Sequence, residues 1–256
     1  MPSTLRLWAS VALAALFVLP QRASPPEPRA TLGPTSAPPI AAALPPPHAP
    51  GSLHASFGRV RVSRDVRRLA NWVVDSGDNQ GLRFLIVDKR RARLFVFDRD
   101  GLLRGDAPVL LGLARGDETV PGIGDRPLAQ VRPEERTTPA GRFVGELGRN
   151  LHEDVVWVDY DAAVSMHRVI TNNPTEQRLH RLATPTVADN RISYGCINVP
   201  AAFFDEWVRP SFESARGIVY VLPDTRTIGQ VFAGLYDVDK VARSRVQRLA
   251  GWSGDH

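Results

Sequence analysis

The sequence predicts a mostly β fold, a sandwich or barrel-like sheet with a few flanking α-helices in an α+β arrangement. Short runs rich in Val, Ile, Leu and Phe recur over residues 84–222, and clusters of Gly, Pro, Asp and Asn separate them. Helical spacing of apolar residues appears in only a few segments. The 256 residues are enough for one domain with a core, even when the proline-crowded first fifth is set aside.

The predicted elements begin with a helix over Ser63–Ser76, where Ser63 is a suitable N-cap and apolar residues repeat at helical spacing. Gly77–Gly81 ends this helix. Two β-rich runs then flank a polar turn, which is typical of a hairpin. A third strand follows, and after it a long polar stretch without period, which we place at the rim of a cleft. These segments are the strands Phe84–Val87 and Arg93–Phe97, the turn Asp88–Arg91, the strand Ala107–Leu113 and the loop Arg115–Arg136.

The second half of the domain alternates strands with polar connections. Pro139 and Gly141 predict a tight turn before a strand that starts near Phe143. Pro200 suits the first position of a helix. The remaining strands are Val155–Tyr160, Ala163–Val169 and Ile218–Leu222, the long polar connection is Thr171–Asn190, the cysteine turn lies within Ile192–Val199, and the helices are Ala201–Ser214, Thr227–Tyr236 and Val238–Trp252.

The N-terminus has the features of an export signal over residues 1–23. Arg6 supplies a positive charge, and Leu7–Leu19 is apolar and uncharged but shorter than the roughly 20 residues of a membrane span. Cleavage after Ala23 and retention as a membrane anchor are the two alternatives. Residues 24–52 are mostly Pro, Ala and Ser, which predicts a disordered linker. We therefore expect an exported protein of the periplasm or cell envelope, with an inner-membrane tether if the anchor is retained.

The charge pattern and the cysteine count narrow the partners. The formal net charge is +5, but the basic residues are interspersed with Asp and Glu, which argues against a nucleic-acid partner. After an export signal, an anionic envelope polymer is the expected partner. A single cysteine forms no intramolecular disulfide. No spacing typical of metal ligands is present, and we expect no metal and no cofactor.

The candidate chemistry centres on Cys196, which lies in a Ser-x-Gly-Cys turn. A cysteine attacks as its thiolate, so it needs a lowered pKa. We expect the upstream His167 to act as its base, and the helix predicted after Pro200 to favour the negative charge through its dipole. The N–H groups of Gly195 and Cys196 are candidates for an oxyanion hole. Ser193 is a candidate for orienting the base or the substrate.

The turn and its surroundings resemble the YkuD-type L,D-transpeptidases. Two further stretches agree with that family in order and spacing, so the resemblance covers about Leu82–Pro223. The residues that carry it are Ser193-Tyr-Gly-Cys196-Ile-Asn198, His167 with Thr171-Asn-Asn-Pro174, the turn Thr138-Pro-Ala-Gly-Arg-Phe143, and the opening strands Phe84–Phe97 with Pro108-Val-Leu-Leu-Gly112.

The resemblance implies a reaction. The family cuts the bond between the third residue, usually meso-diaminopimelate, and the terminal D-Ala of a peptidoglycan stem tetrapeptide. D-Ala leaves, a thioester forms, and an amine resolves it into a 3–3 cross-link or attaches another amine-bearing molecule. By position, Cys196 is the nucleophile and His167 the base, while Ser193, Gly195, Tyr194 and Asn198 shape the turn and bind substrate. Peptidoglycan stem peptides are the implied donor and acceptor.

The sequence departs from the family at several positions. Arg168 follows the His where Gly is common, Tyr194 precedes Gly195 where His or Lys is frequent, and Asn198 stands where many members have Arg. The connection between His167 and Ser193 is also longer than usual. Three arginines are candidates to replace the missing one: Arg178, Arg181 and Arg191.

The candidate catalytic residues also have alternative interpretations. Cys196 has the alternative of a buried inert thiol, His167 that of a hydrogen-bonded core residue, and His180 is the rival base, although its polar surroundings predict a loop. Residues with a simpler expected role are His54 and His152, expected in solvent, Arg90, Arg91 and Arg93, expected on a solvated hairpin face, and Phe203, Phe204 and Trp207, expected in the core.

The leading hypothesis is an exported cysteine L,D-transpeptidase with its catalytic domain over residues 53–226 and a C-terminal helical extension over residues 227–256. Water in place of the amine would make it an L,D-carboxypeptidase or thiol hydrolase of the cell wall. The third hypothesis is a catalytically silent cell-wall binding module. Papain-like peptidases fit less well, because they place the Cys before the His.

Overall fold

The structure is a computed structural model that describes residues 53–150 and 153–252, which lie within one compact unit. The predicted export signal of residues 1–23, the linker of residues 24–52 and His152 lie outside the described residues. Among the helices of the described part, none combines the length and the apolar character needed to cross a membrane.

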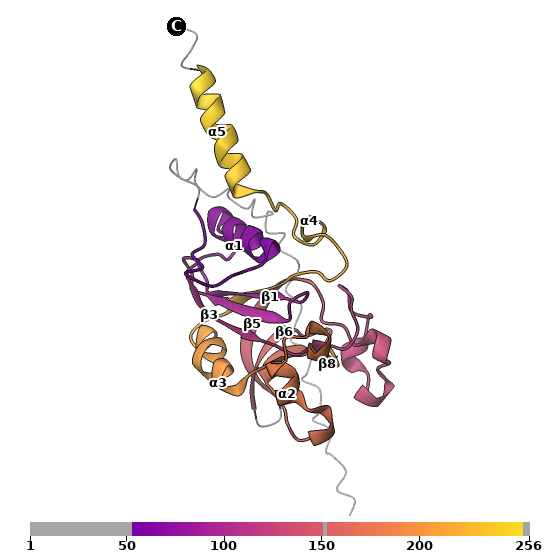
Figure 1. Cartoon of the computed structure of the whole chain (residues 1–256). Coiled ribbons are helices and arrows are strands. Elements are labelled where there is room, and N and C mark those ends of the chain that lie inside the picture. Colours follow the sequence, from indigo (N-terminus) through magenta and orange to yellow (C-terminus); the bar gives the residue numbers. More distant parts are fainter. Residues whose placement is uncertain (1–52, 151–152, 253–256) are drawn as a thin grey trace, which may run out of the picture. The chain divides into compact units, whose positions relative to one another are not determined.

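The described residues form a sheet of eight strands in the order β3-β2-β1-β10-β5-β6-β7-β9 (Figure 1). Most neighbours are antiparallel, while β1 pairs with β10, and β7 with β9, in parallel. The mostly β prediction is therefore confirmed. The strands are β1 Phe84–Asp88, β2 Arg93–Phe97, β3 Leu103–Pro108, β5 Gly141–Asn150, β6 Glu153–Asp159, β7 Val164–Arg168, β9 Ile197–Val199 and β10 Gly217–Val221.

Helix α1, Arg64–Ser76, covers one face of the sheet (Figure 1). As predicted, Ser63 caps it, since its hydroxyl accepts a hydrogen bond from the Val66 N–H at 3.1 Å. Alternate residues of each strand point to opposite faces. Phe84 and Ile86 of β1 accordingly pack with α1, whereas the intervening residues of β1 face a second hydrophobic core on the other side.

That second face is covered by the segment after β9. It was predicted as one regular helix over Ala201–Ser214, and that prediction is wrong in detail. It consists of the α-turn α3 Ala201–Phe203, a π-helical turn over Phe204–Val208 and a 3-10 turn over Arg209–Ser211. Pro210 lacks the N–H that a regular helix would donate to the preceding turn. The core assignment is confirmed: Phe204 is buried, and Phe203 and Trp207 pack against the same cluster.

The predicted strand Ala107–Leu113 is in fact two elements. Strand β3 ends at Pro108, because proline has no N–H to continue the ladder. The chain then forms β4, Leu111–Gly112, which pairs in parallel with β8, Arg191–Ser193, in a separate two-stranded sheet. The pairing of β4 with β8 places the segment that leads into the cysteine turn beside the start of the polar loop of residues 115–136.

Both long polar connections contain more helix than predicted. Residues 115–136 include three 3-10 turns, held in part by the buried Glu135 carboxylate, which pairs with Arg126 and Arg132. The connection after β7 contains the 3-10 turns Pro174–Glu176 and Val187–Asn190 and the helix α2, Arg178–Ala183. Within α2 only Leu182 is buried, so the sequence has no helical repeat of apolar residues that would predict this helix.

The C-terminal helices differ in how well they were predicted. The segment Thr227–Tyr236 is helical only over α4, Ile228–Val231, where Thr227 and Gln230 form a capping box. Helix α5, Val238–Trp252, matches its prediction. Ile228, Phe232 and Val238 are buried in the core cluster that α1 also joins.

Candidate active site

The candidate site lies where β7 and β9 run side by side at one edge of the sheet. Their parallel register pairs His167 with Asn198. Because side chains alternate along a strand, Ser165 and His167 share one face, and Met166 is buried on the other. Cys196 comes directly before β9, so the pairing carries it toward Ser165 and His167.

The side chains of Cys196 and His167 interact with each other, and each shifts the pKa of the other. The imidazole Nδ1 lies 2.7 Å from the Arg168 carbonyl oxygen. A carbonyl only accepts, so Nδ1 carries the proton there, and Nε2 is left to exchange a proton with the thiol. The free thiol of Cys196 is half-buried rather than enclosed. The orientation of the His167 imidazole and the access to the Cys196 thiol therefore suit a base and its nucleophile.

The two groups shift each other's pKa toward the charged pair. Burial opposes charge on His167, but the hydrogen bond and the charge of Cys196 outweigh it and raise the pKa of His167 above its ordinary value. Burial likewise opposes the thiolate, but the hydrogen bond and charge of His167 and hydrogen bonds from Ser165 lower the pKa of Cys196. The arrangement favours a thiolate–imidazolium pair.

Ser165 is a site residue that the sequence analysis missed. Its hydroxyl lies 3.7 Å from the Cys196 sulfur, and the Ala163 carbonyl oxygen is also 3.7 Å from that sulfur. The side chain of Ser165 is buried. The signal was present in the sequence, because a residue two positions before His167 in a strand must share its face.

The cysteine turn requires glycine at Gly195. Its φ is +136°, and a Cβ there would lie 2.8 Å from the Thr137 carbonyl oxygen. Ser193 stabilises the same turn, since its hydroxyl donates to the Cys196 carbonyl oxygen at 2.6 Å and accepts from the Gly195 N–H at 3.1 Å. This differs from the expected oxyanion hole, because the Gly195 N–H is already engaged. Within the described residues, the Cys196 N–H donates no hydrogen bond to a protein acceptor.

Thr138 holds the turn from behind. Its hydroxyl donates to the Gly195 carbonyl oxygen at 2.8 Å and accepts from the Gly112 N–H at 2.9 Å. Thr138 is fully buried. The Thr-Pro-x-Gly stretch, which carried part of the family resemblance, thus fixes the backbone next to the candidate nucleophile.

Asn198 is placed differently from the expectation of a substrate-binding amide. It is 1% exposed. Its Nδ2 donates to the Cys196 carbonyl oxygen at 3.3 Å, and its Oδ1 accepts from Nη1 of Arg178 at 2.5 Å. Both ends of the amide are therefore used inside the protein, where they connect the turn to α2.

Of the three candidate arginines, only Arg178 reaches the catalytic residues. Its charge acts on His167, and its guanidinium bonds Asn198. Arg181 instead donates to the carbonyl oxygens of Glu176 and Asp189. Arg191 is buried and pairs with Asp224 at 2.7 Å.

The other predicted residues lie at the margins of the site. Tyr194 is 37% exposed, and the Arg136 guanidinium lies over its ring, 3.9 Å from the ring centre. His180 lies on α2 rather than in a loop, and its side chain is exposed. Unlike His167, it does not contribute to the pKa shift of Cys196. His54, expected in solvent, is exposed and pairs with Asp239 at 2.8 Å.

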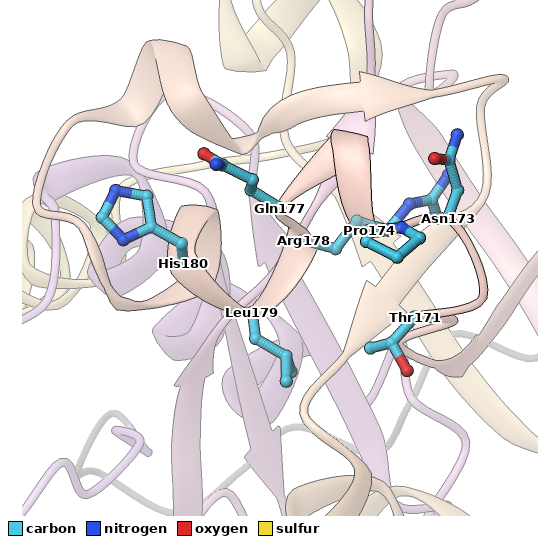
Figure 2. Close-up of a pocket in the computed structure, with 7 residues that line it drawn as sticks. All are labelled: Thr171, Asn173, Pro174, Gln177, Arg178, Leu179 and His180. Carbon is cyan, nitrogen blue, oxygen red and sulfur yellow. The ribbon is translucent and has the colours of Figure 1, made fainter.

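A pocket of about 530 Å³ opens beside the site, in the connection between β7 and β8 (Figure 2). Arg178 is the residue that links this pocket to the catalytic pair, through its bond to Asn198. The pocket is lined by Thr171, Asn173, Pro174, Gln177, Arg178, Leu179 and His180.

A second group of charges lies behind the turn and is completely buried. Lys89 donates to the carbonyl oxygens of Gly116 at 2.5 Å and Thr138 at 2.8 Å, and to the Asp117 carboxylate at 3.0 Å. Its burial lowers the pKa of Lys89, although the carboxylates of Asp224 and Asp117 oppose this shift. Because Lys89 bonds Thr138, this cluster supports the cysteine turn indirectly.

Over residues 53–150 and 153–252, no group of three or more His, Cys, Asp or Glu side chains is arranged to hold a metal ion.

Comparison with known proteins gives matches to solved structures alone. No protein-family model matches the chain, and no curated protein matches it. A variant of the helical cell shape determining protein Pgp2 from Campylobacter jejuni is similar at 14% identity and a TM-score of 0.41, covering 75% of this chain and 64% of that one. An L,D-transpeptidase from Xylanimonas cellulosilytica is similar at 15% identity and a TM-score of 0.32, covering 55% and 60%.

An L,D-transpeptidase variant from Enterococcus faecium is similar at 17% identity and a TM-score of 0.29, covering 55% of this chain and 49% of that one. The chain thus spans between about half and two thirds of the length of these proteins. At these TM-scores the likeness by itself supports no conclusion about activity.

Proposed function

We propose that the protein is a cysteine acyltransferase of the cell wall, an L,D-transpeptidase. One observation carries this proposal: the pairing of β7 with β9 brings the half-buried Cys196 to His167, which lowers the pKa of the thiol and whose tautomer the Arg168 carbonyl fixes. The resemblance of the Ser193–Asn198 turn to the YkuD-type family supplies the substrate class, peptidoglycan stem peptides.

In the first half-reaction the Cys196 thiolate attacks the carbonyl carbon between the third residue and the terminal D-Ala of a stem tetrapeptide. The carbonyl oxygen becomes an oxyanion, for which the Cys196 N–H is the available backbone donor. As the C–N bond breaks, the His167 imidazolium gives its proton to the leaving amine. D-Ala departs, and the acyl group remains on sulfur as a thioester.

In the second half-reaction an acceptor amine attacks the thioester carbon. Neutral His167 takes the proton from the amine, and the thiolate leaves as the new amide forms. A stem-peptide amine gives a 3–3 cross-link, and a protein amine gives an attachment to the wall. Water as acceptor gives an L,D-carboxypeptidase, and the half-buried sulfur leaves room for either acceptor.

The proposal includes the cellular address. The composition of residues 1–52 supports export to the periplasm, with the apolar segment either removed or kept as an inner-membrane tether. Fractionation of the host cells tests this part, since recovery in the cytoplasmic fraction would contradict it.

The decisive test is intact-protein mass spectrometry of the purified protein incubated with a disaccharide-tetrapeptide, beside Cys196→Ala. We expect an adduct equal to the donor minus D-Ala, absent from the variant. Its decay products with and without added amine then distinguish transferase from hydrolase. No adduct and no D-Ala release, with Cys196 also unreactive toward a general thiol reagent, would overturn the proposal in favour of a binding module.

A further inference from the structure

Arg178 is the one residue with a permanent charge in the lining of the pocket beside the catalytic pair. Arg178 contributes to the lining, and Figure 2 shows it at the start of α2, between Pro174 and Leu179. The lining contains no Asp or Glu; its other polar residues are Thr171, Asn173, Gln177 and His180. The Arg178 guanidinium can bind an anion here, although the Glu176 carboxylate beside the lining offsets part of its charge.

The Arg178 guanidinium is held in a fixed orientation. Its Nη1 donates to Asn198 Oδ1 and its Nε to the Glu176 carboxylate, each at 2.5 Å. The side chain is 13% exposed. No hydrogen bond among the described residues uses Nη2, and that atom is not among the buried polar atoms left without a partner. One amino group of a preorganised guanidinium therefore stays accessible to a ligand.

The same guanidinium is close to the reacting groups. Its positive charge acts on His167, and its partner Asn198 bonds the Cys196 carbonyl oxygen. A ligand atom on Nη2 would therefore lie near the bond that the thiolate attacks. Arg181, on the same connection, is placed differently, because its guanidinium bonds the carbonyl oxygens of Glu176 and Asp189 and not Asn198.

We propose that Arg178 binds a carboxylate of the substrate beside the scissile bond, and thereby selects peptides that carry one there. The ligand class is a peptide with a free carboxylate next to the amide that is cleaved. On the proposed function, on which the identity of the peptide rests, two groups share this chemistry: the terminal carboxylate of D-Ala and the side-chain carboxylate of diaminopimelate. A guanidinium recognises either through charge-assisted hydrogen bonds.

A first experiment needs no peptidoglycan. Cys196 is alkylated with iodoacetate, which carries a carboxylate, and with neutral iodoacetamide; in both, sulfur displaces iodide. The ratio of the two rates cancels the thiolate fraction and reports attraction of the carboxylate. We expect Arg178→Met to lower this ratio at least fivefold and Arg178→Lys to lower it less.

Arg181→Met is the matched control, because it removes the same charge from the same helix, where the Arg181 guanidinium bonds the carbonyl oxygens of Glu176 and Asp189. Its ratio should stay within twofold of the wild type. An unchanged ratio in Arg178→Met, or an equal fall in Arg181→Met, would overturn the proposal. Circular dichroism of each variant confirms that it is folded.

A second experiment identifies the carboxylate. D-Ala or D-alaninamide release is measured from three tetrapeptides: unmodified, amidated at the terminal carboxyl, and amidated on the diaminopimelate side chain. We expect one amidation to lower kcat/KM of the wild type at least tenfold, and Arg178→Met to lose that preference. Equal rates on all three peptides in the wild type would contradict the proposal.

The two experiments separate the possible failures. A fall in the alkylation ratio without turnover of any peptide would keep the carboxylate site and remove the peptidoglycan function. Turnover of the peptides with neither Arg178 effect would keep the function and remove the carboxylate site.

Discussion

Two groups of charged side chains lie on either side of the cysteine turn, and they are built differently. Behind the turn, Lys89 and Asp117 have side chains that are 0% and 2% exposed. In front of it, Cys196 and His167 are only partly buried. Both groups place opposite charges together, but only the second presents them to a substrate.

The difference lies in how fully each charge is satisfied. Besides Lys89, the Asp117 carboxylate accepts hydrogen bonds from the N–H groups of residues 224–226 and the Thr225 hydroxyl. Although burial opposes it, this set holds the pKa of Asp117 well below its usual range. The thiolate of Cys196 has few, long contacts to Ser165 and Ala163 besides its bond to His167. A buried charge with a full set of hydrogen-bond partners has a structural role. An accessible charge with few partners remains free to react.

The largest effect should come from Cys196→Ala, which removes the nucleophile. We expect turnover to vanish, because no other thiol is present in the chain. The melting temperature should change by only a few degrees, since the residue is half-buried at the end of a turn. Enzyme assays and thermal melts check both. Residual turnover above the background would show that another group attacks.

His167→Asn should lower kcat/KM by roughly 10²- to 10⁴-fold, the usual contribution of a general acid–base group. His180→Asn is the matched control, because His180 lies in the neighbouring pocket without an interaction with the sulfur. Its kcat/KM should stay within a few-fold of the wild type. A reversed order of the two variants would transfer the role of base to His180.

Lys89→Met should destabilise the fold instead. It leaves the buried Asp117 carboxylate without its cation, while Asp224 keeps its pair with Arg191, and the loss costs about 3–5 kcal/mol. The melting temperature should fall by roughly 10 °C for a domain of this size. Lys240, the chain's other lysine, is exposed, and Lys240→Met should leave the melting temperature unchanged. Equal melting of the two variants would contradict the structural role of the cluster.

Gly195→Ala should lower the free energy of unfolding by about 1–3 kcal/mol, less than Lys89→Met, because it strains a residue at φ +136°. Its Cβ must also move away from the Thr137 carbonyl oxygen, which displaces the attached Cys196. We therefore expect kcat to fall even at temperatures where the variant is folded. Chemical denaturation gives the stability, and assays well below the melting temperature give kcat. Unchanged kcat would show that the turn tolerates the shift.

Much of the fold followed from local pattern. The capped helix α1 carries apolar residues at helical spacing, and the hairpin of β1 and β2 and the strands β6, β7 and β10 are short runs rich in apolar and β-branched residues. The turn motif likewise singled out Cys196, and the spacing to a strand histidine singled out His167. These features depend on neighbours in the sequence, so the sequence could reveal them.

What the sequence could not reveal depends on distant partners. Lys89 lies in a polar turn, and its burial results from residues 27 to 135 positions away, such as Gly116, Thr138 and Asp224. Helix α2 buries a single side chain and therefore lacks an apolar period. The helix predicted to favour the thiolate begins at Ala201, after strand β9. A dipole that acts within about one turn does not extend across a strand of roughly 10 Å.

The most direct test of the account is the pH dependence of Cys196 alkylation by iodoacetamide in the wild type and in His167→Asn. The account predicts that the thiolate of the wild type persists below the usual cysteine pKa of about 8.5, and that the rate falls only as the pH drops through the lowered pKa. In His167→Asn the inflection should move up to the usual value or above it, because burial then acts unopposed. An inflection at or above the usual value in the wild type, or the same inflection in both proteins, would contradict the thiolate–imidazolium pair.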